Sequence, residues 1–213
     1  MSYLFEQVAQ LVKKLSKSGW SKSDVTLLGQ ASAEKLNNVL LYLHGQIDIV
    51  RIKHTIDLAK SPRLPFDGAD EVVKHDSTIN GKNVVEIELR SDDNLYIDGK
   101  KVVLHLSERQ IGNKTVVGHE LRKELESGER VLLNSNVLDY LYDHPELFPE
   151  HWKKDGSRET RYIHFWGSVF RDPSGVSLCV RYLYWGVGGL YRYYGWLDRG
   201  WVRRDPAASL ASN

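Results

Sequence analysis

Residues 181–212 read RYLYWGVGGLYRYYGWLDRGWVRRDPAASLAS, a stretch crowded with Tyr, Trp, Arg and Gly. It contains no Lys, Glu, Gln, Met or Asn, although Lys and Glu are frequent in the rest of the chain. Aromatic residues are favoured in strands, and glycines mark the turns that join them. This stretch therefore predicts strands and turns rather than helix.

The same composition begins near Thr160, because RYIHFWGSVF (161–170) and VSLCVRYLYW (176–185) flank a turn signal at 172–175. From Thr160 onward the chain has no Lys and no Glu, yet half of its arginines lie there. A buried aromatic sheet explains the tryptophans but leaves the arginines unexplained. Rigid aromatics with Arg are typical of protein-recognition surfaces. A groove for single-stranded nucleic acid uses the same residue types and stays open as an alternative.

The composition of the whole chain sets limits on partners and compartment. The 213 residues carry a formal net charge of +1, which gives no overall attraction to nucleic acid or acidic membranes. The single cysteine, Cys179, excludes a disulfide within the chain and a zinc site built on several cysteines. No run approaches 18 apolar residues, and MSYLFEQVAQLVKKLSKSG (1–19) lacks the features of a signal peptide. We expect a cytoplasmic protein without a membrane partner.

The first residues predict a helical unit over 1–46. Apolar side chains recur there at spacings of three and four, which places them on one face of a helix. Ser21 and Asp24 have the spacing of a capping box at the start of a second helix. The apolar positions are Leu4, Phe5, Val8, Leu11, Val12, Leu15, Leu36, Val39, Leu40 and Leu43.

From residue 47 the sequence predicts a β-containing domain that extends to residue 213. Asn80-Gly81 and Asp98-Gly99 are dipeptides of type I′ hairpin turns and lie between alternating apolar runs. Residues 118–127 and 134–143 have the pattern of short helices, the second opened by an Asn cap and ended before a proline. The fold class we expect is α+β: an N-terminal helical unit, then an antiparallel β region with short helices.

Catalytic and metal-binding motifs are missing from the sequence. His119-Glu120 begins like a zinc-protease helix, but Lys123 stands where the second His is required. The His–carboxylate pairs in HTID (54–57) and KHDS (74–77) lack a second ligand at metal spacing. Cys179 lies in an alternating apolar strand, where an inert buried thiol is typical. We expect no catalytic residue, cofactor or metal; an enzyme of unknown class is the second alternative, because catalytic trios are recognised by geometry.

Several segments together resemble a group of uncharacterised proteins that occur in multiple copies in small-genome uncultivated microbes. The similar segments are HTIDLAKSPRLPFDGADEVVKH, LLNSNVLDYLYDHPELFPEHWK, YIHFWGSVFRDPSGVSLCVRYLYW and DPAASLAS, so the resemblance covers roughly residues 50–212. The tail resembles the variable region, here about 160–212, of proteins diversified by a retroelement whose reverse transcriptase mutates template adenines. The resemblance implies a C-type lectin-like β region and a diversified protein-binding function.

The residue types of the tail agree with this resemblance. Adenine mutation at codons of the form AA-pyrimidine yields Tyr, Gly, Arg, Asp, Val, Leu, Ser, His or Cys, but never Lys, Glu, Gln or Met. Trp codons contain no adenine, so the tryptophans would be fixed scaffold that holds the sheet. The resemblance therefore implies a scaffold of Trp166, Trp185, Trp196, Trp201, Pro206, Ala207 and Ala208.

The remaining tail positions are those that the resemblance implies to be displayed toward a ligand. We expect an unknown protein ligand, and the sequence does not predict the oligomeric state. Tyr191, Tyr193 and the pair Arg203-Arg204 are the expected main binding residues. Alternatively, Tyr184 and Tyr193 lie on an inward strand face, and Arg203-Arg204 is a solvated pair. The displayed positions are Gly186, Gly195 and Gly200, together with ten ligand-binding residues: Tyr182, Tyr184, Tyr191, Tyr193, Tyr194, Arg199, Val202, Arg203, Arg204 and Asp205.

Overall fold

A computed structural model describes Gln10, Lys13, Lys14 and residues 53–211, except for positions 68, 70, 113 and 129. The chain divides into two units, Met1–Ile52 and Lys53–Asn213, and the fold described here is that of the second unit. The predicted helical unit over 1–46 and its boundary at 46–47 lie outside the described residues, apart from Gln10, Lys13 and Lys14, which are helical.

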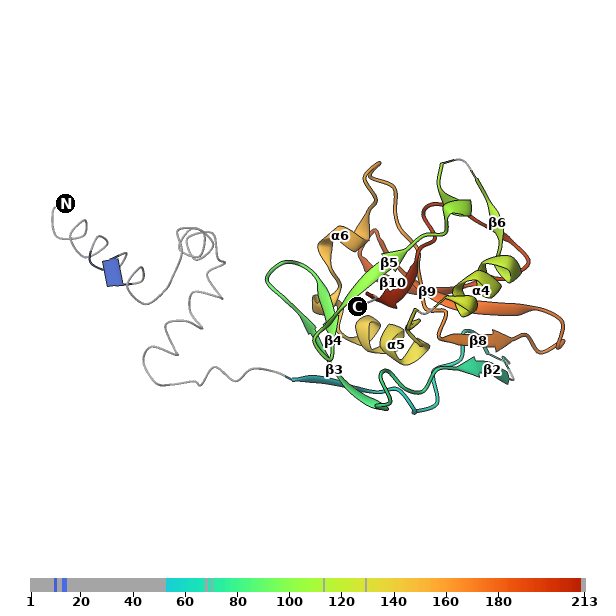
Figure 1. Ribbon diagram of the computed structural model, residues 1–213, viewed down its shortest axis with the longest axis horizontal. Helices are drawn as coiled ribbons and strands as arrows, with labels where there is room; N and C mark the ends of the chain where they lie inside the picture. Colours follow the sequence, from blue (N-terminus) through green and yellow to red (C-terminus); the bar gives the residue numbers. More distant parts are fainter. Residues whose placement is uncertain are drawn as a thin grey trace. The chain divides into compact units, whose positions relative to one another are not determined.

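The second unit is an α+β domain built on a mostly antiparallel sheet (Figure 1). Nine strands follow one another in the order β1-β3-β4-β5-β12-β7-β9-β8-β2, and β10 pairs with β9. Strands β12 and β7 pair in parallel, and β11 and β6 form a separate two-stranded ladder. The strands are β1 His54–Asp57, β2 Glu71–His75, β3 Val84–Leu89, β4 Leu95–Ile97, β5 Lys100–His105, β6 Val116–Val117, β7 Ile163–His164, β8 Ser168–Arg171, β9 Leu178–Gly186, β10 Gly189–Trp196, β11 Gly200–Trp201 and β12 Ala207–Leu210.

Both predicted turns are present, with the positive φ angles that their residues tolerate. Asp98 and Gly99 have φ of 47° and 76° and join β4 to β5, so this hairpin prediction is confirmed. Asn80 and Gly81 have φ of 52° and 76°, but they close only an isolated bridge between Ile79 and Lys82.

Three α-helices accompany the sheet: α4 Gly118–Ser127, α5 Ser135–Asp143 and α6 Glu150–Lys153. The first two confirm the predicted helices. The Asn134 side chain accepts hydrogen bonds from the N–H groups of Asn136 and Val137, which satisfies two free donors at the start of α5. Two 3-10 helices, η1 Glu108–Gln110 and η2 Pro145–Leu147, lie in the same unit.

The C-terminal strand β12 lies inside the sheet and connects its two halves. It pairs with β5 through Ala208 and Leu104, and with β7 through Ala207 and His164. Its residues Ala208 and Leu210 belong to the main hydrophobic core, together with Leu138 of α5. Helix α5 packs against β9, β1 and β10.

A second hydrophobic core lies beneath α4 and the tail. It contains Trp166 and Trp201, whose ring centroids are 4.9 Å apart and which are both fully buried. Gly118 of α4 packs so closely on this core that an added Cβ would lie 2.4 Å from the Trp201 Nε1 atom. None of the helices in the described part of the chain has the length and apolar character needed to span a lipid bilayer.

Candidate ligand-binding surface

The hairpin of β9 and β10 brings tail tyrosines together on one face. The register pairs Tyr184 with Tyr191 and Tyr182 with Tyr193, and side chains two residues apart on a strand share a face. Tyr184 and Tyr191 stack with centroids 5.4 Å apart, and Tyr182 meets Tyr193 edge-on at 6.1 Å. Tyr162, which directly precedes β7, lies 5.4 Å from both Tyr182 and Tyr184. These five residues are the tyrosine cluster.

A pocket of about 460 Å³ opens beside the tyrosine cluster, and we call it the Tyr–Arg pocket. Its wall consists of four tyrosines from the cluster and of residues from the segment 199–205, which follows β10 and includes β11. Seven of the ten residues expected to bind ligand line this one pocket. The lining is Tyr162, Tyr182, Tyr184, Tyr193, Arg199, Gly200, Val202, Arg204 and Asp205.

Two arginines give the Tyr–Arg pocket its charge. The Arg204 guanidinium lies over the Tyr162 ring, 5.2 Å from the centroid, and its charge also acts on the Asp205 carboxylate. Arg199 lies 5.9 Å from the Tyr182 centroid and 4.9 Å from that of Trp201. Its Nη2 atom is 4.0 Å from the Oδ1 atom of Asp205. Guanidinium groups on aromatic faces retain donors for a carboxylate or another acceptor.

Asp205 lines the pocket but differs from the expected displayed residue, because its side chain is only 6% exposed. Its Oδ2 atom accepts a hydrogen bond of 3.0 Å from the Val202 N–H, and its own N–H donates to the Val202 carbonyl. Burial raises the pKa of Asp205, while the Val202 N–H and Arg199 act in the opposite direction. The carboxylate thus closes the 202–205 turn, so its main role is structural.

Tyr182 also differs from the expectation. It is 8% exposed and lies among Tyr162, Tyr193 and the buried His164, with only an edge on the pocket. Burial raises the pKa of Tyr182 to about 12. By contrast Tyr184 is half-buried and Tyr193 is 56% exposed, which excludes the alternative that Tyr193 is a core residue.

The other three expected binding residues lie outside the pocket. Tyr191 is 42% exposed and donates a hydrogen bond to the Val187 carbonyl in the hairpin turn. Tyr194 points to the opposite side of β10 and packs on Phe66, with ring centroids 4.9 Å apart. Arg203 is exposed, as the alternative of a solvated pair predicts, and its Nη2 atom lies 2.6 Å from Asp155 Oδ2.

The expected scaffold tryptophans fall into two groups. Trp166 and Trp201 are fully buried in the second core. Trp185 and Trp196 are half-buried: Trp185 lies under the Lys153 ammonium at 3.7 Å, and Trp196 packs on Phe66. The expected scaffold also includes Pro206, Ala207 and Ala208, which are all buried at β12, where the Pro206 carbonyl accepts a hydrogen bond from the His164 N–H.

Two of the displayed glycines have little room for a side chain, which differs from the expectation that these positions vary. A Cβ at Gly200 would lie 2.3 Å from Thr115 Cγ2. A Cβ at Gly195, which is buried, would lie 2.8 Å from the Arg199 Nη2 atom. A Cβ at Gly186 would meet the Tyr191 ring at 3.0 Å, a tight contact with a movable side chain.

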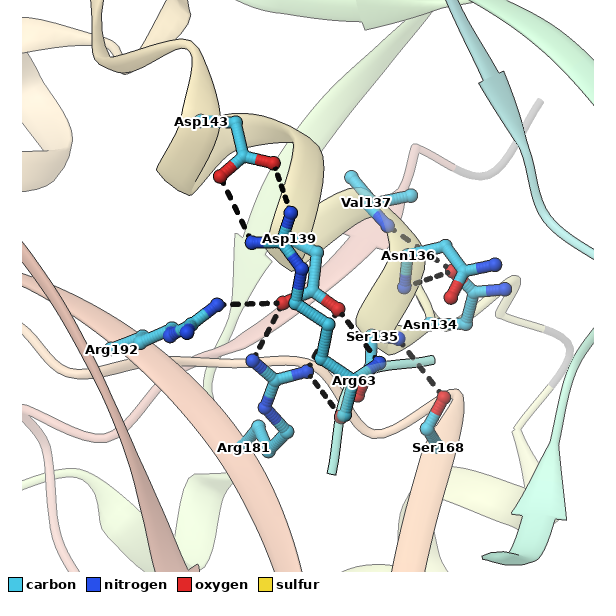
Figure 2. A network of polar contacts seen from close by, with 10 residues as sticks. All are labelled: Arg63, Asn134, Ser135, Asn136, Val137, Asp139, Asp143, Ser168, Arg181 and Arg192. Atoms are coloured by element: carbon cyan, nitrogen blue, oxygen red, sulfur yellow. Dashed lines mark hydrogen bonds and ion pairs between the residues drawn. The ribbon is translucent and has the colours of Figure 1, made fainter. Parts of the chain in front are cut away.

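A polar network with a buried centre, Arg181 and Asp139, connects the β9–β10 hairpin to α5 and to the 58–67 loop (Figure 2). Arg181 of β9 makes two hydrogen bonds with the Asp139 carboxylate, of 2.6 and 3.0 Å, and a third with the Arg63 carbonyl. Arg192 of β10 reaches the same carboxylate at 3.5 Å. Arg63 in turn forms a bidentate pair with Asp143 at 2.9 and 2.6 Å. The network fixes the hairpin from the side opposite to the tyrosine cluster.

The chemistry that the Tyr–Arg pocket offers is recognition by aromatic faces, hydroxyl groups and guanidinium groups. Its lining contains no Ser, Cys or His. Cys179 is fully buried, and burial raises the pKa of its thiol to about 12, so it carries no thiolate at neutral pH. His164 is also fully buried, with neither ring nitrogen hydrogen-bonded within the described residues.

One cluster of side chains was missed from the sequence. His54, His144 and Glu146 each present one donor atom within 4.8 Å of the others. No metal site was expected, because the His–carboxylate pair at 54–57 has no second ligand at metal spacing in the sequence. In the sequence, His144 and Glu146 lie close together on either side of Pro145. The third residue, His54, is distant in sequence and comes close to them because β1 packs beside α5.

Comparison with models of known protein families finds no match to this chain. No curated protein and no solved structure is significantly similar to it. The geometry of the site and the composition of the tail are therefore the basis for inferring function.

Proposed function

We propose that this chain is a ligand-binding protein of the C-type lectin-like class whose C-terminal tail forms a diversified recognition surface. The observation that carries the proposal is that most of the expected ligand-binding residues line the Tyr–Arg pocket. Seven of ten positions selected for their residue types line one pocket, although they come from β9, β10 and the turn beyond. A protein is the ligand we propose, because exposed tyrosines and arginines are the residues that dominate binding at protein interfaces.

The separation of rigid framework from exposed tail residues supports diversification. Trp201 and Pro206 are buried, whereas Tyr193, Arg199 and Arg204 are exposed. A recognition surface that changes its sequence needs a platform whose stability does not depend on the changing residues. The arrangement of these side chains fits that requirement.

Two features of the fold support the C-type lectin-like assignment. The domain has an antiparallel sheet with two successive short helices, α4 and α5, between β5 and the tail strands. The strand β12 pairs with β5, so the segment that runs from β5 to β12 begins and ends on neighbouring strands of the sheet.

The proposal is tested by sequencing this gene from many cells or relatives of its source population. Diversification predicts that the copies share Trp166, Trp201 and Pro206 but differ at exposed positions such as Tyr193 and Arg204. Tails that are identical in every copy, or that vary at the buried tryptophans as often as at the pocket, would refute it.

Binding of single-stranded nucleic acid is a second candidate function. It is favoured by the two guanidiniums that lie over tyrosine rings, since bases stack on such rings while arginines contact phosphates. It requires salt-dependent binding of a single-stranded oligonucleotide, with a salt slope that falls by about 1 when Arg204 is replaced by Ala. Absence of binding at low salt would exclude it.

A further inference from the structure

The His54 cluster lies at the junction of β1 with the end of α5. His54 is the first residue of β1, His144 is the C-cap residue of α5, and Glu146 lies in η2 directly after it. Two half-buried imidazoles and an exposed carboxylate therefore meet where segments distant in sequence pack together.

Tyr140 orients both imidazole rings. Its hydroxyl is hydrogen-bonded to the Nδ1 atom of His54 at 3.0 Å, and its ring stacks on His144 with centroids 4.4 Å apart. The two imidazoles face each other edge-on at 5.2 Å. A hydrogen bond at one ring nitrogen fixes the tautomer and the orientation of a metal-binding histidine. Since Nδ1 of His54 is engaged, its Nε2 atom is the one available to an ion.

We propose that His54, His144 and Glu146 bind a divalent transition-metal ion of the zinc type. Two imidazoles and one carboxylate form a donor set that Zn²⁺ uses, with a fourth position for water, whereas Ca²⁺ and Mg²⁺ prefer oxygen ligands alone. The site needs only short side-chain movements, because tetrahedral bonds of about 2.0–2.1 Å place donor atoms roughly 3.3 Å apart. Glu146 supplies most of the movement: its side chain is 61% exposed and makes one 3.1 Å hydrogen bond to His144.

The bound ion connects an edge strand to the main core. Among the strands that the structure describes, β1 ends the sheet order and pairs with β3, while α5 supplies Val137, Leu138 and Leu141 to the core. An ion held by β1 and by the end of α5 binds the folded chain in preference to the unfolded chain, so it raises the melting temperature as its concentration increases.

The test uses the full-length, untagged protein after dialysis against a chelator. Co²⁺ is added while the visible absorption of tetrahedral cobalt is recorded, and Zn²⁺ binding is then measured by calorimetry. The expected result is saturation at one equivalent and a thermal transition that rises with Zn²⁺ concentration. His54→Ala and His144→Ala abolish the cobalt spectrum, and Glu146→Gln weakens Zn²⁺ binding by at least about tenfold.

His119→Ala is the matched control. His119 is another half-buried histidine beside a carboxylate, 2.9 Å from Asp198, and replacing it leaves binding unchanged. Circular dichroism shows whether the two His54-cluster alanine variants are folded. Glu146→Gln keeps the test decisive if they are not, because its side chain is exposed. The proposal is wrong if Co²⁺ and Zn²⁺ do not saturate a single site, or if Glu146→Gln and His119→Ala have equal effects.

Discussion

Arg181 of β9 and Asp139 of α5 form a bidentate ion pair whose side chains are only 2% and 12% exposed (Figure 2). One arginine of the tail is thus part of the interior, and it secures the hairpin that carries the tyrosine cluster. A charge buried in this way depends on its partner, because the protein interior solvates an isolated ion poorly.

Asp139→Ala is expected to lower the free energy of unfolding by about 3–5 kcal/mol, because it leaves the Arg181 guanidinium buried without a counter-ion. Asp143→Ala is the matched control on the same helix. It breaks another bidentate arginine pair whose side chains are 50% and 44% exposed. Exposed pairs contribute at most about 1 kcal/mol, so the control costs much less. Urea unfolding measures both variants, and equal losses would show that the Arg181 pair is not the structural contact described here.

Acid is expected to destabilise the domain through His164. Burial, followed by the Arg199 charge, holds the pKa of this histidine well below its ordinary value of 6.5. Below pH 6.5 the unfolded chain therefore binds a proton that the folded chain does not, and the free energy of unfolding falls by about 1.4 kcal/mol per pH unit. Above pH 6.5 both states are neutral at this site and its contribution is constant.

The pH experiment compares wild type with His164→Leu. Burial also lowers the pKa of His105, so the wild type loses stability from two histidines between pH 6.5 and about 5. His164→Leu removes one of these contributions and therefore gives a shallower slope than the wild type. Parallel curves for wild type and His164→Leu would contradict the assignment.

Replacement of exposed pocket residues is expected to leave the fold intact. Tyr193→Ser and Arg204→Ser should each change the free energy of unfolding by less than about 1 kcal/mol, because both side chains are exposed. Trp201→Ala should cost about 3–5 kcal/mol, because this indole is fully buried in the second core. Denaturant unfolding of the three variants distinguishes a platform with displayed residues from a continuous core, in which Tyr193→Ser would also be costly.

Gly200 is expected to resist substitution despite its place among the displayed positions. A Cβ there meets Thr115 Cγ2 at 2.3 Å, so Gly200→Ala forces one of the two segments to move and destabilises the domain by roughly 1–3 kcal/mol. Thr115→Ser removes that methyl group, and in combination with Gly200→Ala it restores most of the lost stability. The steric explanation fails if Thr115→Ser gives no rescue in a double-mutant cycle of unfolding free energies.

Local features of this fold were predictable from the sequence. Helix α5 could be placed because its apolar spacing, Asn134 cap and the proline after His144 are all local signals. The β4–β5 hairpin followed from Asp98-Gly99 in the same way. The pairing of β12 with β5 and β7 had no such signal, because contacts between distant segments leave no periodic pattern in either one.

The same limit applies to the candidate site. The residue types of the tail were enough to predict most of the positions that line the Tyr–Arg pocket. Composition did not predict which arginines are buried and which line the pocket. Arg181 is buried in an ion pair with Asp139, whereas Arg204 lines the Tyr–Arg pocket. Nor did it show that the 202–205 turn closes through the Asp205 side chain, or that His54 lies beside His144.

The most direct test of the proposed diversification is to sequence the genomic neighbourhood of this gene. The proposal predicts a reverse-transcriptase gene and a near-copy of codons 160–212 that differs from the tail only at adenines. Those differences should fall at exposed positions such as Tyr184, Tyr193, Arg199 and Arg204, and not at Trp166, Trp201 or Pro206. A neighbourhood without such a near-copy, or one whose differences ignore adenines and reach the buried scaffold, would contradict a diversified recognition surface.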